Sequence, residues 1–209
     1  MKLIEDLQWR YATKAFDPNR KVTDKDLDQL KEAIRLSVSS YGLQSYKVLI
    51  IENNEVRHEL RKASWDQQQI TDASHLFVFC NHTTDFNKDV DDYIDRIATA
   101  QGSRPDQLVQ YGEFIKTKVN EMPATERKSW SEKQTYIALN NLLIACAALR
   151  IDACPMEGFD NAEYNRILGL DDLGLNASVI APVGYRAAID PSQHWKKIRK
   201  TTEELFEMA

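Results

Sequence analysis

The sequence feature that most constrains the fold is a long helical pattern that runs from Ser131 to Arg150. From Tyr136 onward its side chains are apolar on nearly all sides, with Asn140 and Asn141 as polar exceptions. A surface helix carries one apolar stripe, whereas a helix that is apolar all round is buried all round. The pattern therefore predicts a central helix, or a helix that a second subunit partly covers.

Composition fits one globular domain. The chain has 209 residues, of which 43% are hydrophobic, and these can supply a sizeable core. Its net charge of −5 argues against a general surface for nucleic acid or anionic membranes. The apolar run over 136–149 is shorter than the ~18 residues of a membrane span, and the first residues contain no apolar signal core.

The three cysteines, Cys80, Cys146 and Cys154, lie in or beside apolar runs and lack a CxxC or other metal-ligand spacing. We expect buried free thiols, which are typical of a reducing compartment, and hence a cytoplasmic protein. The four histidines form no evident metal-binding constellation either, so no metal site is predicted.

Periodicity and turn residues predict alternating helices and strands. Helices are expected at 3–9, 23–38, 54–63, 85–101, 105–120, 131–150 and 163–168, and strands at 46–51, 75–81 and 178–185. The strands at 46–51 and 75–81 are apolar enough to be covered on both faces. Pro182 in the last strand argues for a sheet edge or a bulge. The region of about 85–122 is polar enough to be a helical excursion or lid.

Two basic clusters lie at opposite ends of the chain. Arg10 and Lys14 are four residues apart, and Lys197 and Arg199 belong to a dense basic patch over 194–200. A helix that continues to Lys14 puts the first pair on one face, whereas a helix that ends earlier leaves both on a loop. Pairs of this kind are usually solvated. Together, however, the clusters could hold a phosphate through charge-assisted hydrogen bonds.

The third feature is the hexapeptide from Pro155 to Asp160, which follows a short extended piece and precedes a helix. The glycine after Glu157 lets the backbone approach a ligand closely, because no Cβ is in the way. Free N–H groups at such a turn can point at an electron-rich partner. Spacing alone favours an ordinary strand-to-helix turn with Asp160 as the N-cap.

Taken together, these pieces resemble the FMN-dependent nitroreductase family, specifically its oxygen-insensitive NAD(P)H nitroreductase and flavin reductase branch. The matching pieces are Arg10-x-x-x-Lys14-x-Phe-Asp, Ser39-Ser40-x-x-x-Gln44, Asp72-Ala73-Ser74, Pro155-x-Glu157-Gly158-Phe159-Asp160, the Pro-Val-Gly strand and Lys197-x-Arg199. Each is weak singly, but together they span nearly the whole chain in the order of the family.

The resemblance implies an α+β fold with a central, mainly antiparallel mixed sheet flanked by helices. It implies that residues 1–209 form a single FMN-binding domain with the helical excursion at about 85–122. It also implies an intertwined homodimer, with two FMN sites at the subunit interface.

The resemblance further implies the roles of individual residues. Arg10, Lys197 and Arg199 would bind the FMN phosphate, and Lys14 would lie near the pyrimidine side of the flavin. The Glu157–Gly158 backbone would contact the ring around N5 and O4. Ser39 and Ser40, with their loop, would come from the other subunit. The full implied set is Arg10, Tyr11, Ala12, Lys14, Ser39, Ser40, Gly42, Asp66, Gln69, Pro155, Met156, Glu157, Gly158, Lys197 and Arg199.

The chain departs from the family at several of these positions. Ala12 stands where a serine is common, which removes a hydroxyl contact to the phosphate. Asp66 and Gln69 replace an Asn and a Lys near the flavin pyrimidine, and Tyr41-Gly42 replaces a Thr-Asn pair. A lost cation at Gln69 is expected to make the flavin harder to reduce.

The activity implied by the resemblance is ping-pong hydride transfer through flavin N5. NADPH or NADH would be the co-substrate, and a nitroaromatic, a quinone or free flavin would be the small-molecule acceptor. No side chain is needed as nucleophile, acid or base. Two alternatives stay open: a flavin-binding or carrier protein with little turnover, and a family member that reduces one specific metabolite. A nucleic-acid contact at 194–200 is disfavoured because one short basic run gives too few phosphate contacts.

Overall fold

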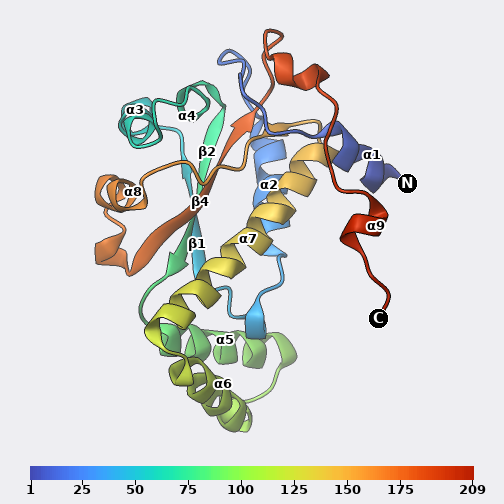
Figure 1. Ribbon diagram of the computed structural model, residues 1–209. Helices are drawn as coiled ribbons and strands as arrows, with labels where there is room; N and C mark the ends of the chain where they lie inside the picture. The colour runs from blue at the N-terminus through green and yellow to red at the C-terminus, as the bar shows by residue number, and fades with distance from the viewer.

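The computed structural model describes residues 1–209 and has an α+β fold built on one four-stranded sheet (Figure 1). In order across the sheet the strands are β1 (Tyr46–Ile51), β2 (His75–His82), β4 (Leu175–Gly184) and β3 (Asp152–Ala153). All neighbouring strands pair antiparallel. The one parallel pairing is an isolated bridge between Ala12 and Ala153. The sheet is therefore mainly antiparallel, as expected, and this bridge is its only parallel element.

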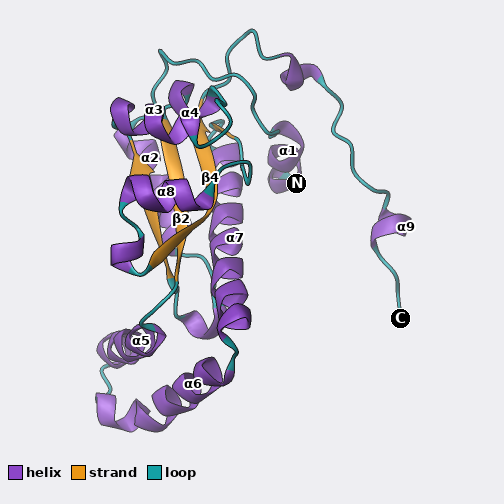
Figure 2. Cartoon of the chain, turned by 60° about the vertical axis from the view of Figure 1, so that its left-hand side comes forward, coloured by secondary structure: helices purple, strands orange, loops and turns teal.

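The chain has nine α-helices. They are α1 (Lys2–Trp9), α2 (Asp24–Arg35), α3 (Asn54–Lys62), α4 (Gln69–Asp72), α5 (Phe86–Gln101), α6 (Val109–Glu121), α7 (Ala124–Ala148), α8 (Asn161–Leu168) and α9 (Thr202–Leu205). Helices α2 and α7 pack on one face, and α3, α4 and α8 pack on the other (Figures 1 and 2). Four short 3-10 turns lie between them, at Ser40–Gly42, Pro105–Leu108, Asp171–Leu173 and Pro191–His194.

Strand β2 lies in the middle of the two core layers. Its side chains alternate, as a strand requires: Phe77 and Phe79 enter the layer with α2 and α7, and Leu76, Val78 and Cys80 enter the layer with α3 and α8. The prediction of a strand covered on both faces is therefore confirmed for β2. Strand β1 also packs into both layers, with Leu49 and Ile51 in one and Val48 and Ile50 in the other, but it is only half-buried because it forms an edge of the sheet.

Pro182 does not mark an edge strand. Strand β4 lies between β2 and β3, and its bulge is at Ser178, which the pairing with Phe79 and Cys80 skips, not at Pro182. The carbonyl of Pro182 accepts from Cys154 N at 3.0 Å, so this residue turns its backbone toward the short β3 side. Its missing N–H therefore costs β4 no bond to β2, which explains why a proline is accommodated here.

Helix α7 begins at Ala124, seven residues before the predicted start at Ser131. Its polar first turns were missed because they bury little, although Trp130 packs against Phe86 with ring centroids 6.0 Å apart. In the single chain α7 is not buried all round. Tyr136 and Ile137 are 36% and 37% exposed. Of the two expectations for this helix, burial within its own chain is therefore wrong, and partial cover by a second subunit stays a prediction.

Helices α5 and α6 form the expected excursion beyond the sheet (Figures 1 and 2). They have a small core of their own, which consists of Leu43, Phe86, Val90, Ile94, Ile115 and Val119. The excursion sits at the N-terminal end of α7, whereas α1 packs against α7 near the opposite end. Helix α7 therefore sets the distance between these two regions.

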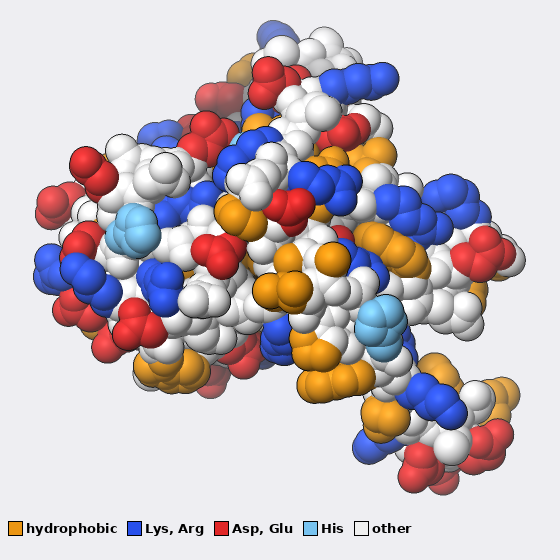
Figure 3. Space-filling view, turned by 90° about the horizontal axis from the view of Figure 1, so that it is seen from above, with side chains coloured by type: hydrophobic (Ala, Val, Ile, Leu, Met, Phe, Trp, Pro, Cys, Tyr) orange, Lys and Arg blue, Asp and Glu red, His pale blue; other side chains and the backbone are white.

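The C-terminal segment leaves the body after His194. Figure 2 shows it running outward to α9, and in Figure 3 it is a projecting lobe with apolar side chains on its surface. Trp195, Ile198 and Phe206 are exposed apolar residues of this segment. The three cysteines are buried and free, as predicted. None of the helices combines the length and the apolar character needed to cross a membrane.

Candidate functional site

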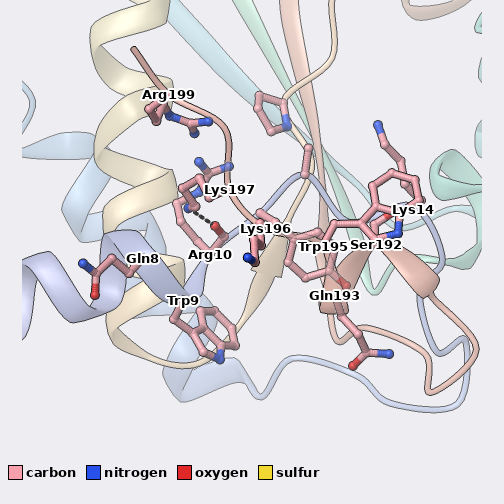
Figure 4. Close-up of a pocket in the computed structure, with 13 residues that line it drawn as sticks. Gln8, Trp9, Arg10, Lys14, Ser192, Gln193, Trp195, Lys196, Lys197 and Arg199 are labelled. Atoms are coloured by element: carbon pink, nitrogen blue, oxygen red, sulfur yellow. Dashed lines mark hydrogen bonds between the residues drawn. The ribbon is translucent and has the colours of Figure 1, made fainter. Parts of the chain in front are cut away.

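The two basic clusters meet in one pocket of about 500 Å³ (Figure 4). Seven of the fifteen predicted site residues line it: Arg10, Tyr11, Ala12, Lys14, Pro155, Lys197 and Arg199. The other lining residues are Gln8, Trp9, Ser192, Gln193, Trp195 and Lys196. Residues from both ends of the sequence therefore form one concave surface beside the Pro155 turn.

The segment after α1 is extended, which decides between the two arrangements left open for Arg10 and Lys14. Helix α1 ends at Trp9, and Arg10 has φ −70° and ψ 145°. Ala12 then bridges to Ala153, and Phe16 bridges to Arg186. The segment thus runs along the end of the sheet, where its side chains reach the pocket from a loop rather than from a helix face.

The cations of this pocket lack acidic partners. No ion pair in the molecule involves Arg10, Lys14, Lys197 or Arg199. Burial lowers the pKa of Arg10, and the charge of Arg199 lowers it further. Burial also lowers the pKa of Lys197, followed by the charges of Arg10 and Arg199. Like charges gathered in this way oppose one another until an anion joins them.

Figure 4 shows how these cations are arranged. Arg10, Lys197 and Arg199 gather on one side of the pocket, and Lys14 lies on the other side, near Ser192. Lys197 Nζ donates to the carbonyl oxygens of Leu7, at 2.6 Å, and of Arg10. The tail is thereby held against the C-terminal end of α1, which brings its basic side chains to the pocket.

The turn at 155–160 is fixed by backbone hydrogen bonds from two sides. Met156 exchanges two hydrogen bonds with Ile180 of β4, at 2.8 and 3.1 Å, and Asp160 N donates to Ala63 O at 2.8 Å. The Asp160 side chain accepts from Glu163 N at 3.1 Å and so caps α8. The predicted N-cap is confirmed, and the same hydrogen bonds hold Glu157 and Gly158 in place at the surface.

Gly158 is needed for a close approach between two loops. A Cβ at this position would lie 2.5 Å from the ring of Trp65. Gln67 Nε2 donates to Gly158 O at 2.9 Å. Trp65 and Asp66 both have left-handed backbone conformations, with φ 53° and 55°. The loop that contains the predicted Asp66 therefore lies directly against the predicted Gly158 turn.

The remaining predicted residues lie outside the pocket. Gln69 is buried at the start of α4, and Asp66 is exposed beside the Gly158 turn. Ser40 N donates to Gln134 Oε1 of α7 at 2.9 Å. Gln134 and Ala148 are roughly 21 Å apart along α7, at about 1.5 Å per residue. Since α1 and the pocket lie near the Ala148 end, the loop with Ser39, Ser40 and Gly42 does not reach the pocket of its own chain.

Sequence reasoning missed several residues of the site. Ser192 and Gln193 follow an Asp-Pro pair, which is a turn signal but does not indicate a pocket wall. Trp195 and Lys196 belong to the recognised basic patch. Trp9 was treated only as part of a short helix, and nothing local in the sequence indicates that its ring lies against the guanidinium groups of Arg150 and Arg186.

Comparison with known proteins gives the family. The model of the Nitroreductase family matches residues 7–185. The protein named "Putative NAD(P)H nitroreductase YfkO" of Bacillus subtilis is 36% identical over 216 residues, which cover 98% of this chain and 96% of the relative. A Staphylococcus epidermidis protein of the same description, SERP2086, is 34% identical over 218 residues, which cover 98% and 95%.

Solved structures share the fold at lower identity. The protein named "putative nitroreductase ydfN" of Bacillus subtilis has a TM-score of 0.85 at 19% identity, with coverage of 100% and 99% of the two chains. A protein of Exiguobacterium sibiricum, named "putative nitroreductase" and solved in complex with FMN, has a TM-score of 0.85 at 17% identity, with coverage of 99% and 97%. The chain belongs to the Nitroreductase family.

Proposed function

We propose that this protein is an FMN-dependent NAD(P)H oxidoreductase, and that residues 1–209 form one FMN-binding domain. The observation that carries the proposal is the group of Arg10, Lys197 and Arg199, which face one pocket without an acidic partner. The family assignment supports it, as do the FMN bound in the Exiguobacterium sibiricum structure and the NAD(P)H nitroreductase name of YfkO.

The residues present fit a flavin mononucleotide. Three unpaired cations on one side of the pocket suit a phosphate group, which accepts charge-assisted hydrogen bonds from several donors at once. The pocket volume of about 500 Å³ lies within the usual range for small-ligand sites. Pro155 lines the pocket and leads to the Gly158 turn, so a ligand with its phosphate at Arg10 can direct its ring toward that turn.

Bound FMN would supply the redox chemistry, taking a hydride from NADPH or NADH at N5 and giving it to a nitroaromatic, a quinone or free flavin. The chain itself would bind the FMN and orient its ring. Arg10, Lys197 and Arg199 hold the phosphate, and Lys14 places a positive charge near the pyrimidine edge of the ring. The Glu157–Gly158 backbone presents its N–H groups to the other edge. No side chain is required as an acid, a base or a nucleophile.

The proposed working form is an intertwined homodimer. The Ser39–Ser40 loop lies far from the pocket of its own chain, so its proposed flavin contact requires a second copy. The exposed Tyr136 and Ile137 of α7, and the apolar side chains of the projecting tail, support such an interface. Pairing of two copies buries these surfaces and completes two equivalent sites, as expected of a closed symmetric dimer.

The cytoplasm is the proposed compartment, because three free thiols persist best where the environment is reducing.

The proposed reductase activity is tested by steady-state oxidation of NADPH and of NADH with menadione or nitrofurazone as acceptor. Activity with either acceptor supports a reductase. A bound flavin that neither nicotinamide reduces would favour the carrier alternative. Flavin reduction without use of either acceptor would favour a family member specific to one metabolite.

A further inference from the structure

Asp190 is a completely buried carboxylate that lies behind the pocket wall. Its exposed fraction is 0%, and it does not line the pocket. Its Oδ2 accepts from Lys14 N at 2.8 Å, Ala15 N at 3.2 Å and the Tyr11 hydroxyl at 2.9 Å. Its Oδ1 accepts from Ser192 N at 2.8 Å. One side chain therefore holds four donors from two segments that are far apart in the sequence.

These two segments form adjoining walls of the pocket, since Lys14 and Ser192 both donate their N–H to the same carboxylate. Tyr11 and Lys14 line it from the N-terminal segment, and Ser192 lines it at the base of the tail that carries Lys197 and Arg199. The two segments are otherwise joined by a few backbone bonds, among them Ala187 N to Ala15 O at 2.9 Å, and by the bonds of Lys197 Nζ to Leu7 O and Arg10 O. Buried donors that lose their acceptor are costly, so the carboxylate strongly favours the joined arrangement.

No cation neutralises Asp190. The nearby guanidinium of Arg186 lies over the rings of Trp9 and Tyr11, with its charge paired to Asp152 at 2.6 Å. Burial alone would raise the pKa of Asp190, but the N–H donors of Lys14, Ala15 and Ser192 together lower the pKa below its ordinary value. The side chain is therefore an anion that is held by hydrogen bonds alone. Its negative charge strengthens the hydrogen bonds that it accepts from the four donors.

We infer that Asp190 is a positioning residue for the phosphate end of the flavin site, which joins the N-terminal segment to the tail so that cations from both ends of the chain meet one anion. This inference rests on the proposed function. It assigns Asp190 no contact with the ligand. Its effect is to reduce the ordering that the two walls must undergo when the phosphate binds, which is the general advantage of a preorganised site.

The test is Asp190→Asn, which keeps the size of the side chain but removes its charge and turns one oxygen acceptor into a donor. Affinities for FMN and for riboflavin, which lacks the phosphate, are measured by fluorescence titration of the flavin-free full-length protein. We expect the dissociation constant of FMN to rise about 10- to 100-fold, the scale of lost hydrogen bonds to a charged group. The riboflavin constant is expected to rise by a smaller factor, because the ring contacts at Gly158 are untouched and Asp190 reaches the ring site only through Lys14.

Asp89→Asn is the matched control. Asp89 is also largely buried, and it accepts from His82 Nδ1 at 2.9 Å, but it lies on α5, away from the pocket. It is expected to leave both flavin affinities unchanged. If Asp190→Asn fails to fold, Tyr11→Phe removes one of the four donors while retaining the carboxylate, and a smaller loss confined to FMN is expected.

An unchanged FMN affinity in folded Asp190→Asn would overturn the inference. Equal losses for FMN and riboflavin would also overturn it, because they would indicate a general structural role. Both results leave the proposed function intact, since the wild-type protein still binds FMN. Failure of the wild-type protein to bind either flavin would instead remove the proposed function, and this inference with it.

Discussion

The hydroxyl of Tyr136 donates a hydrogen bond of 2.8 Å to a carboxylate oxygen of Glu157, and so ties the exposed stripe of α7 to the turn at Gly158. Burial raises the pKa of the Tyr136 hydroxyl, and the acceptor Glu157 raises it further, so Tyr136 stays protonated as the donor. The turn is thus also anchored to α7, in addition to its bonds to β4, to the end of α3 and to Gln67.

Tyr136→Phe removes this anchor and retains the ring. We expect flavin reduction by NADPH or NADH to slow about fivefold to tenfold, because the Glu157–Gly158 backbone loses part of its orientation at the ring. Rapid-mixing absorbance measurements give the rate. The control is Tyr46→Phe on β1, which removes a hydroxyl that accepts from the Gln44 side chain. Equal rates in the Tyr136→Phe and wild-type proteins would show that the hydrogen bond does not orient the turn.

Arg199→Ala tests the phosphate end of the site. We expect FMN binding to weaken by about 1.5–3 kcal/mol, the scale of a lost charged hydrogen bond. Lys200→Ala is the control, since Lys200 is the adjacent exposed cation of the same patch and does not line the pocket. Equilibrium dialysis of FMN compares the two variants. Equal affinities for both would mean that Arg199 contributes only to the general charge of the tail.

Lys14 and Gln69 offer opposite tests of the charge around the ring. Lys14→Ala is expected to lower the two-electron potential of the bound flavin, because negative charge on the reduced ring loses a neighbouring cation. Gln69→Lys restores the cation that is usual in the family and is expected to raise the two-electron potential of the bound flavin. Each change is expected to reach about 30 mV, which is ~1.4 kcal/mol for two electrons. Dye equilibration measures both, and shifts of the same sign would contradict the assigned placement.

The burial of His75 predicts that the protein loses stability at acidic pH. It is buried at the start of β2, where Nε2 lies 2.9 Å from Glu52 and Nδ1 lies 3.0 Å from the Ser74 hydroxyl. Burial lowers its pKa, an effect that Glu52 opposes and the charges of Arg57 and Lys21 reinforce. Below the unfolded value of about 6.5 the unfolded chain takes up a proton that the folded chain does not, so stability falls as the pH falls.

Denaturant unfolding between about pH 7 and 5 measures this effect, since the free energy of unfolding then includes the proton taken up by His75. The wild-type protein is expected to lose stability over this range, and His75→Asn is expected to lose less. The same steepness in both proteins would assign the acid sensitivity to other groups.

Much of the fold was accessible from local pattern. Strand β2 was predicted because its apolar run is short and bounded, and α2 was found from the cap at Thr23, which accepts from Asp26 N. The start of α7 was missed because its first turns are polar and gain their packing from α5. The prediction of a sheet edge or a bulge at Pro182 was wrong because a sequence does not show which neighbouring strand the missing N–H would have faced.

The candidate site was predicted unevenly, for a physical reason. Arg10, Lys14, Lys197 and Arg199 were found because unpaired basic clusters stand out in an acidic chain. Asp190 was missed, since its role depends on four donors that only the folded chain brings together. The resemblance supplied Ser39 and Ser40 as site residues, and one chain alone does not bring them to the pocket.

The measurement that tests the central claim most directly is the visible absorption spectrum of the purified protein, taken before and after anaerobic addition of NADPH or NADH. We expect a yellow protein with bands near ~450 and ~370 nm that bleach on reduction, because the bound flavin carries the chemistry. A colourless protein that also fails to take up added FMN would contradict the account, and would leave the basic pocket without its proposed ligand.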